Sequence, residues 1–311
     1  MSELDAAGIT DPRLRSDYQH CRRLAAGHGR TYFLATRLLP PERRSAVHAL
    51  YGFARTADEI VDDTADGRGP HQRAAELVRF AADFRRGATA EDPSCRAVSD
   101  TARRYDLDPS LFSDFLDSMR ADLTVTRYET FEDLMGYMHG SAAVIGRQLV
   151  PVLGTVAPSG EAEPYAARLG VAFQLTNFIR DVGEDLDRGR VYLPQQTWHA
   201  AGVSADELQR RVVTPGIRSA LGHEIARARA IYAEAEPGIE LLEPVSRHCV
   251  RTAFTLYGDI LAAVEAADYR VLDRRVSVGR ARRLRVALPG LVRALRARRA
   301  GRATPMRTRW P

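Results

Sequence analysis

The sequence contains no lysine: all 45 basic residues among its 311 residues are arginine. Without lysine the chain cannot form a Schiff base with a carbonyl substrate or a pyridoxal cofactor, and it cannot supply the lysine of a phosphate-binding P-loop. No apolar run approaches the roughly 20 residues needed to cross a bilayer. These absences exclude several enzyme classes and predict a protein without a membrane-spanning helix.

Cysteine is scarce and scattered. Cys21, Cys95 and Cys249 lack metal-ligand spacing, which argues against a zinc site or a disulfide framework and indicates a reducing compartment. The polar, acidic N-terminus does not have the features of a signal or transit peptide. We therefore expect a cytoplasmic protein.

Charge is unevenly distributed along the chain. The net charge is +5, but from Arg270 onward there are 14 arginines and a single acid, Asp273, so residues 1–269 carry −8. Such a basic end predicts peripheral contact with an anionic membrane surface, and the alternatives are a solvated, frayed end and nucleic-acid binding. We expect no nucleic-acid partner, because the tail offers only Trp310 as an aromatic. The oligomeric state is left open.

Hydrophobic periodicity predicts an all-α protein. Apolar residues recur at intervals of three and four, as in Leu50, Phe53, Ala57 and Val61, and no long period-two pattern predicts a strand. Proline and glycine separate these segments, as expected for helices joined by short loops in one bundle. We divide the chain into a flexible N-terminal segment (1–18), one helical domain (19–288) and an arginine-rich tail (289–311).

The first candidate site is a polar stripe on a predicted helix. Tyr51, Arg55, Asp58 and Asp62 are spaced four, three and four residues apart, so they share one helix face. Acids at i and i+4 repel each other and oppose helix formation, and Glu59 adds to the repulsion. A solvated polar face is the alternative, but residues that oppose folding favour a function such as cation binding.

A second stripe has the same design. Gln174, Asn177, Asp181 and Asp185 are spaced three, four and four residues apart. Carboxylate and amide oxygens on facing helices can hold Mg²⁺, whose coordination is completed by substrate phosphates. No histidine pair or cysteine at ligand spacing favours zinc or iron. We predict an Mg²⁺ site between the stripes, with Mn²⁺ as the alternative.

Two such pairs across a cavity would bind a diphosphate. Arg55 and Arg180 can add bidentate contacts to phosphate oxygens as charge develops on a leaving group. The remaining wall would be apolar, because both helices are otherwise rich in Ala, Leu, Val, Ile and Phe. The combination predicts prenyl diphosphate chemistry.

At these residues the sequence resembles the squalene/phytoene synthase family, most closely its bacterial phytoene synthase members. Tyr51 to Asp62 resembles the first aspartate-rich motif of the family. The stretch from Leu175 to Asp185 resembles the second, and 189–194 continues it. Residues 137–146 resemble a small-residue helix between the two motifs. The resemblance covers about residues 20–285.

The resemblance implies an isoprenoid-synthase-type fold with a central cavity and a catalytic domain at 19–288. It implies a prenyltransferase that condenses two geranylgeranyl diphosphates head to head, with Mg²⁺, through a cyclopropylcarbinyl (prephytoene) diphosphate to phytoene. That reaction is the first committed step of carotenoid biosynthesis, and we expect it to need no NADPH.

The resemblance also implies roles for individual residues. The implied metal ligands are Asp58, Glu59, Asp62, Asn177, Asp181 and Asp185. The implied diphosphate contacts are Arg55, Arg180, Tyr192 and Arg275. Gln174 would lie near the reacting carbons, and the implied wall residues are Tyr51, Tyr137, His28, Thr31 and Tyr32. This sequence departs from the family at Thr31, often serine, at Tyr32, often phenylalanine, and at Glu59, often aspartate.

Two alternatives to the phytoene reaction stay open. A fifteen-carbon enzyme would make squalene, presqualene diphosphate or dehydrosqualene from farnesyl diphosphate, and it would differ in cavity depth, which the sequence does not resolve. A catalytically silent assembly or scaffold relative would be expected to lose aspartates, whereas both pairs are present here.

Overall fold

The computed structural model describes residues 2–62, 67–279, 281–286, 288–290 and 292–293, without the side chains of residues 30 and 31. Among these residues there are helices and two isolated β-bridges but no strand. The helices are α1 Glu3–Ala6, α2 Pro12–His28, α3 Arg30–Thr36, α4 Pro41–Asp62, α5 Pro70–Arg85, η1 Gly87–Thr89, α6 Pro93–Tyr105, α7 Ser110–Ala121, α8 Phe131–Met138, the π-helical turn η2 His139–Ala143, α9 Val144–Leu153, α10 Ser159–Asp187, α11 Gln195–Ala200, α12 Ala205–Gln209, α13 Pro215–Ala235, η3 Glu236–Leu241 and α14 Pro244–Ala266.

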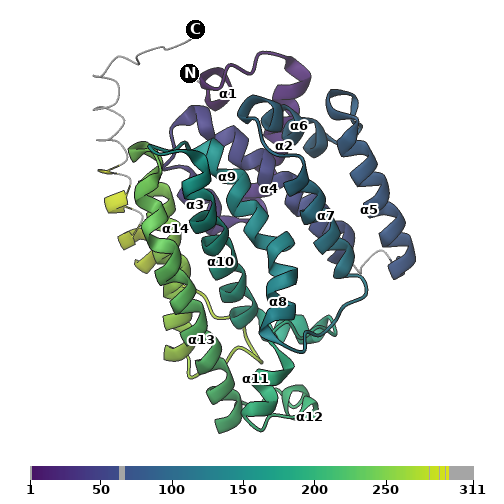
Figure 1. The fold of residues 1–311 in the computed structure, drawn as a ribbon, viewed down its shortest axis with the longest axis vertical. Helices are drawn as coiled ribbons and strands as arrows, with labels where there is room; N and C mark the ends of the chain where they lie inside the picture. Colours follow the sequence, from purple (N-terminus) through teal and green to yellow (C-terminus); the bar gives the residue numbers. More distant parts are fainter. Residues whose placement is uncertain (1, 63–66, 280, 287, 291, 294–311) are drawn as a thin grey trace.

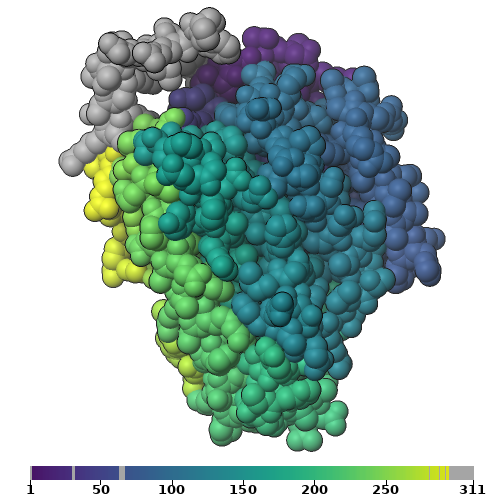
Figure 2. Space-filling view, viewed as in Figure 1, coloured from purple at the N-terminus to yellow at the C-terminus, as the bar shows by residue number. Residues whose placement is uncertain are grey.

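Helix α10 runs through the middle of the bundle and organises it (Figure 1). It packs against α9, α13 and α14, while α2, α4 and α6 pack against one another on the other side. In the space-filling view the purple-to-blue half of the chain and the green half form two sides of one body (Figure 2). The predicted all-α bundle is confirmed, and none of the described helices is long and apolar enough to cross a membrane.

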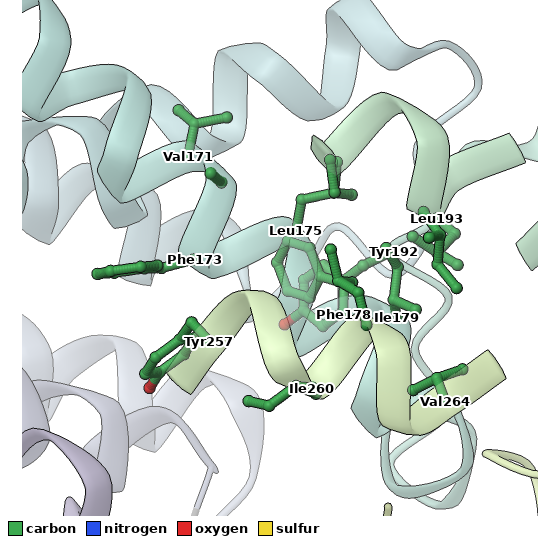
Figure 3. Close-up of a cluster of buried hydrophobic side chains, with 14 of the residues drawn as sticks. Val171, Phe173, Leu175, Phe178, Ile179, Tyr192, Leu193, Tyr257, Ile260 and Val264 are labelled. Carbon is green, nitrogen blue, oxygen red and sulfur yellow. The ribbon is translucent and has the colours of Figure 1, made fainter. Parts of the chain in front are cut away.

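The apolar face of α10 explains its central place. Val171, Leu175, Phe178 and Val182, spaced three or four residues apart, are all buried. Figure 3 shows that Phe173, on another side of the helix, lies beside Tyr257 of α14, and their ring centroids are 4.5 Å apart. Because the apolar stripe is fixed in the core, the polar stripe of Gln174, Asn177, Asp181 and Asp185 lies about a quarter turn around the helix from it.

The small-residue segment near residue 140 allows helices to approach closely. A Cβ at Gly146 would lie 2.1 Å from the carbonyl oxygen of Ala166, and one at Gly170 would lie 2.3 Å from that of Ala142. Neither position can hold a larger side chain without a shift of backbone. These glycines therefore bring η2 and α9 against α10.

The predicted flexible N-terminal segment, 1–18, is corrected for residues 2–18. Ser2 caps α1 through a capping box with Asp5, and Leu4, Ile9 and Tyr18 are buried in a small core of their own. These apolar residues are too few and too far apart to form a periodic pattern, so the mostly polar sequence does not predict that they are buried. Of the predicted tail, 289–311, residues 291 and 294–311 lie outside the part that the structure describes.

Candidate active site

The first acidic pair lies at the C-terminal end of α4. Arg55 Nη1 donates a hydrogen bond to Asp58 Oδ2 at 2.7 Å. Burial and then the charge of Asp62 raise the pKa of Asp58 to about 6, although its side chain is 42% exposed. Carboxylates at this end also face the negative end of the helix dipole. The fold therefore holds two carboxylates where their mutual repulsion and the helix dipole both disfavour negative charge, as expected for a cation site.

The second acidic pair lies at the C-terminal end of α10. Burial and then the charge of Asp181 raise the pKa of Asp185 to about 8. Asp181 accepts hydrogen bonds from Arg180 Nε at 2.7 Å and forms an ion pair with Arg275 Nε at 3.0 Å. Two of the three arginines implied by the family resemblance, Arg180 and Arg275, therefore lie beside the second pair.

Two further arginines connect the pairs. Asp62 Oδ1 lies 2.6 Å from Arg190 Nη1, and Asp62 Oδ2 lies 3.2 Å from Arg188 Nη1. Because these arginines directly follow α10, their bonds place the end of α4 beside the end of α10. The charge of Asp62 is also among the causes that raise the pKa of Asp185. The fold thus brings the two predicted stripes together.

The donor set fits a hard divalent cation. The side-chain oxygen of Asn177, one turn before Asp181, is buried without a hydrogen-bond partner. Carboxylate and amide oxygens are the ligands that Mg²⁺ takes from proteins. In this structure the guanidinium groups of arginines bind Asp62 and Asp181. Within the described residues no three acidic, histidine or cysteine side chains converge on one point.

A buried carboxylate that the sequence analysis did not single out links two predicted tyrosines. Asp122, just after α7, accepts hydrogen bonds from the Tyr137 hydroxyl at 2.5 Å and from the Tyr192 hydroxyl at 3.0 Å. Its backbone oxygen accepts a third bond from Arg190 Nη2 at 3.1 Å. Burial raises the pKa of Asp122 to about 6. Asp122 therefore fixes both phenols beside the arginine that binds Asp62.

The segment after α10 is held in place by its backbone. Val191 N donates to Thr126 O at 2.8 Å and Gln195 N to Tyr128 O at 2.9 Å. The ring of Tyr192 then stacks on Phe178 of α10, with centroids 4.2 Å apart. These contacts carry Arg190 and Tyr192 to the acidic pairs.

An apolar cavity of about 250 Å³ extends from the acidic end of the site into the bundle. At the acidic end it is lined by Tyr51 and Ala54 of α4 and by Gln174 of α10. Farther along α10, Gly170, Ala166 and Ala162 line it. The cavity thus follows both helices away from their carboxylates, as expected for a hydrocarbon chain attached to a diphosphate.

The N-terminal wall residues have different surroundings. His28 Nε2 lies 3.8 Å from Glu59 Oε1, and Glu59 also accepts a bond from Arg55 Nε at 2.9 Å, so His28 and Glu59 lie beside the first pair. Tyr32 lines the cavity, with its ring centroid 5.3 Å from that of Tyr257. The side chain of Thr31 lies outside the described part of the structure.

Sequence reasoning missed Asp122, Arg188 and Arg190. Arg190 stands in the stretch 189–194 already noted for its resemblance, and Arg188 directly precedes that stretch, so their position was a usable signal. Asp122 had none, because a single acid beyond the end of a helix forms no stripe.

Comparison with known proteins identifies relatives over most of the chain. A family model described as squalene/phytoene synthase matches residues 25–282. The chain is 38% identical to a chloroplastic phytoene synthase of Daucus carota over 294 residues, 93% of this chain and 73% of that protein. It is 38% identical to a chloroplastic phytoene synthase 1 of Arabidopsis thaliana over 280 residues, 88% of this chain and 65% of that protein.

Solved structures agree with this result. A crystal structure of a dehydrosqualene synthase in complex with ligand superposes with a TM-score of 0.79 at 26% identity, covering 94% of this chain and 98% of that one. A squalene synthase from Alicyclobacillus acidocaldarius superposes with a TM-score of 0.75 at 27% identity, covering 85% of this chain and 98% of that one. The resemblance drawn from the aspartate-rich motifs is confirmed, and this chain belongs to the squalene/phytoene synthase family.

Proposed function

We propose that this enzyme is a phytoene synthase that condenses two geranylgeranyl diphosphates through prephytoene diphosphate, the first committed step of carotenoid biosynthesis. The observation that carries the proposal is the pairing of two acidic helix ends with an apolar cavity that follows α4 and α10. The identity of 38% to phytoene synthases supports the twenty-carbon substrate over the fifteen-carbon alternative, whose solved representatives are 26% and 27% identical.

Enzymes of this family act with divalent metal ions on prenyl diphosphates. We propose Mg²⁺ here, held by Asp58, Asp62, Asn177, Asp181 and Asp185. Bound there, it would withdraw charge from the leaving diphosphate. Glu59 contacts Arg55 and His28 in this structure, so its longer side chain orients the arginine beside the site. Arg55, Arg180 and Arg275 are each paired with an acid near the site and would bind the oxygens of the departing diphosphate.

An aromatic cluster beside the acidic pairs is suited to cationic intermediates. The rings of Tyr137, Phe178 and Tyr192 form one cluster, with the Tyr137 and Tyr192 centroids 5.6 Å apart. Electron-rich ring faces stabilise a nearby cation. Both phenols donate their protons to Asp122, which fixes the orientation of the two rings. The apolar cavity excludes the water that would quench a cation.

We propose a cytoplasmic enzyme in peripheral contact with anionic membrane. The support for membrane contact is the presence of 14 arginines and a single acid from Arg270 onward. The support for a reducing compartment is the three buried free cysteines. We propose that the reaction uses no NADPH, since phytoene forms by loss of a proton rather than by reduction.

The decisive test is a product assay with purified protein and Mg²⁺. Geranylgeranyl and farnesyl diphosphate are supplied in parallel, with and without NADPH. We expect a forty-carbon hydrocarbon from the first substrate, unaffected by NADPH. A thirty-carbon product only would move the enzyme to squalene-type chemistry, and no product from either substrate would indicate a silent relative.

A further inference from the structure

The C-terminal helical segment, defined as described residues 281–293, lies along the outside of α14 (Figure 1). Arg282 binds Asp259 of α14 through two hydrogen bonds, from Nε at 2.8 Å and from Nη2 at 2.9 Å. Farther along, Gly290 is buried, and a Cβ there would lie 2.7 Å from Thr252 Oγ1. Because Arg282 contacts residue 259 and the later Gly290 contacts the earlier residue 252, the segment runs antiparallel to α14.

One face of this segment is an uncovered apolar stripe. Leu284, Leu288 and Val292 are 55%, 56% and 48% exposed. Their spacing of four places them on one helix face. Only three other large hydrophobic side chains among the described residues are exposed, and they are scattered: Val78 on α5, and Val156 and Val212 in two separate connections. Exposed apolar side chains that gather on one face indicate a contact surface.

The charges beside the stripe select its partner. Every charged residue described in the segment is an arginine: Arg282, Arg283, Arg285 and Arg293. A helix with one apolar face and basic flanks is typical of proteins that lie on anionic lipid. A second copy in a symmetric contact would bring arginines against arginines, and nucleic acid would not use the apolar stripe.

We propose that the stripe of Leu284, Leu288 and Val292, with its flanking arginines, docks the enzyme onto an anionic lipid bilayer. The segment touches Thr252, and the next residue, Ala253, lines the apolar cavity. Helix α14 therefore lies between the docking face and the cavity. This placement would bring the membrane close to the cavity from which a hydrocarbon product is released. That advantage rests on the proposed function, whereas the docking itself does not.

The test measures binding of the full chain to vesicles without substrate. Wild-type protein is sedimented with vesicles of phosphatidylcholine alone or with phosphatidylglycerol added. We expect at least tenfold stronger partitioning to the anionic vesicles, weakened by high salt. The variant Leu284→Ser/Leu288→Ser/Val292→Ser should lose at least tenfold of that binding. The matched control Val78→Ser/Val156→Ser/Val212→Ser should retain it.

Each other outcome overturns the docking surface. Equal binding by both triple variants would mean that the stripe is not the contact. Equal partitioning to neutral vesicles would remove the role of charge. Self-association that the stripe variant abolishes, seen by analytical ultracentrifugation, would assign the face to a second copy of the chain. If circular dichroism shows that the triple variant is unfolded, Leu288→Ser alone should still lower binding severalfold.

Product formation in detergent is measured separately on the same proteins. Intact phytoene synthesis without vesicle binding would refute the docking alone. Vesicle binding by a protein that forms no product would refute the proposed function alone.

Discussion

Blocking the deep part of the cavity should shorten the substrate that the enzyme accepts. Ala166 lines the cavity on α10 and precedes Asp181 by fifteen residues, which is about 22 Å of helix. An extended hydrocarbon chain advances about 1.3 Å per carbon–carbon bond. The sixteen-carbon main chain of a geranylgeranyl group is therefore about 20 Å long and that of a farnesyl group about 15 Å.

These lengths set the expected effect of Ala166→Phe. With its diphosphate beside the acidic pairs, a geranylgeranyl chain reaches the level of residue 166, whereas a farnesyl chain ends about one helical turn short of it. The phenyl ring would displace the last isoprene unit, and one methylene in a fitted pocket is already worth about 1–3 kcal/mol. We expect kcat/KM for geranylgeranyl diphosphate to fall roughly 100-fold, about 3 kcal/mol, with farnesyl diphosphate nearly unaffected.

The assay compares the two substrates on the same protein preparation. Hydrocarbon products are extracted and quantified, so an unfolded variant reveals itself by losing both activities. The control is Ala54→Phe, which adds the same ring at the acidic end of the cavity and should impair both substrates equally. If Ala166→Phe lowers both activities by the same factor while remaining folded, or lowers neither, the cavity along α10 does not hold the substrate chain.

Three other perturbations test the site and the fold. Asp58→Asn or Asp181→Asn should lower product formation at least 100-fold. The circular dichroism spectrum should stay unchanged, because the charged pairs oppose folding and the loss of one charge does not unfold the helices. Near-wild-type turnover would contradict the metal site. Burial lowers the pKa of His48 to about 4, below its value of about 6.5 in an unfolded chain. Stability conferred by its neutral form is present above pH 6.5 and lost as the pH falls toward 4. Thermal unfolding should show that the free energy of unfolding falls by about 2 kcal/mol at pH 5 and that His48→Gln removes this loss. An equal loss in the variant would refute the assignment of the effect to His48. Gly146→Ala, whose Cβ would lie 2.1 Å from a backbone oxygen, should cost about 2 kcal/mol or more in urea unfolding, whereas Gly160→Ala, with nothing within 4 Å, should be nearly neutral.

Local patterns carried the fold class and the acidic stripes. The apolar residues of α10 at intervals of three and four predicted both the helix and its buried face, since helical periodicity is a local property of the chain. The same helical spacing predicted that Asp181 and Asp185, which are four residues apart, lie on one helix face. These predictions needed no knowledge of other helices.

The contacts between distant segments were not accessible in the same way. Nothing near Asp122 indicates that it accepts bonds from Tyr137 and Tyr192, because that arrangement depends on how the segment after α10 lies against the one after α7. The packing of Leu4 and Ile9 depends likewise on a neighbouring helix surface rather than on a periodic signal.

The sequence by itself therefore determined the helices, the residue types of a diphosphate site and the family. Tertiary structure alone decided that Arg190 bonds to Asp62, that the cavity continues along α10 to Ala162, and that Leu284, Leu288 and Val292 remain uncovered. The physical reason is that periodicity fixes which side of a helix is apolar, whereas a pairing between distant residues depends on how the helices pack together.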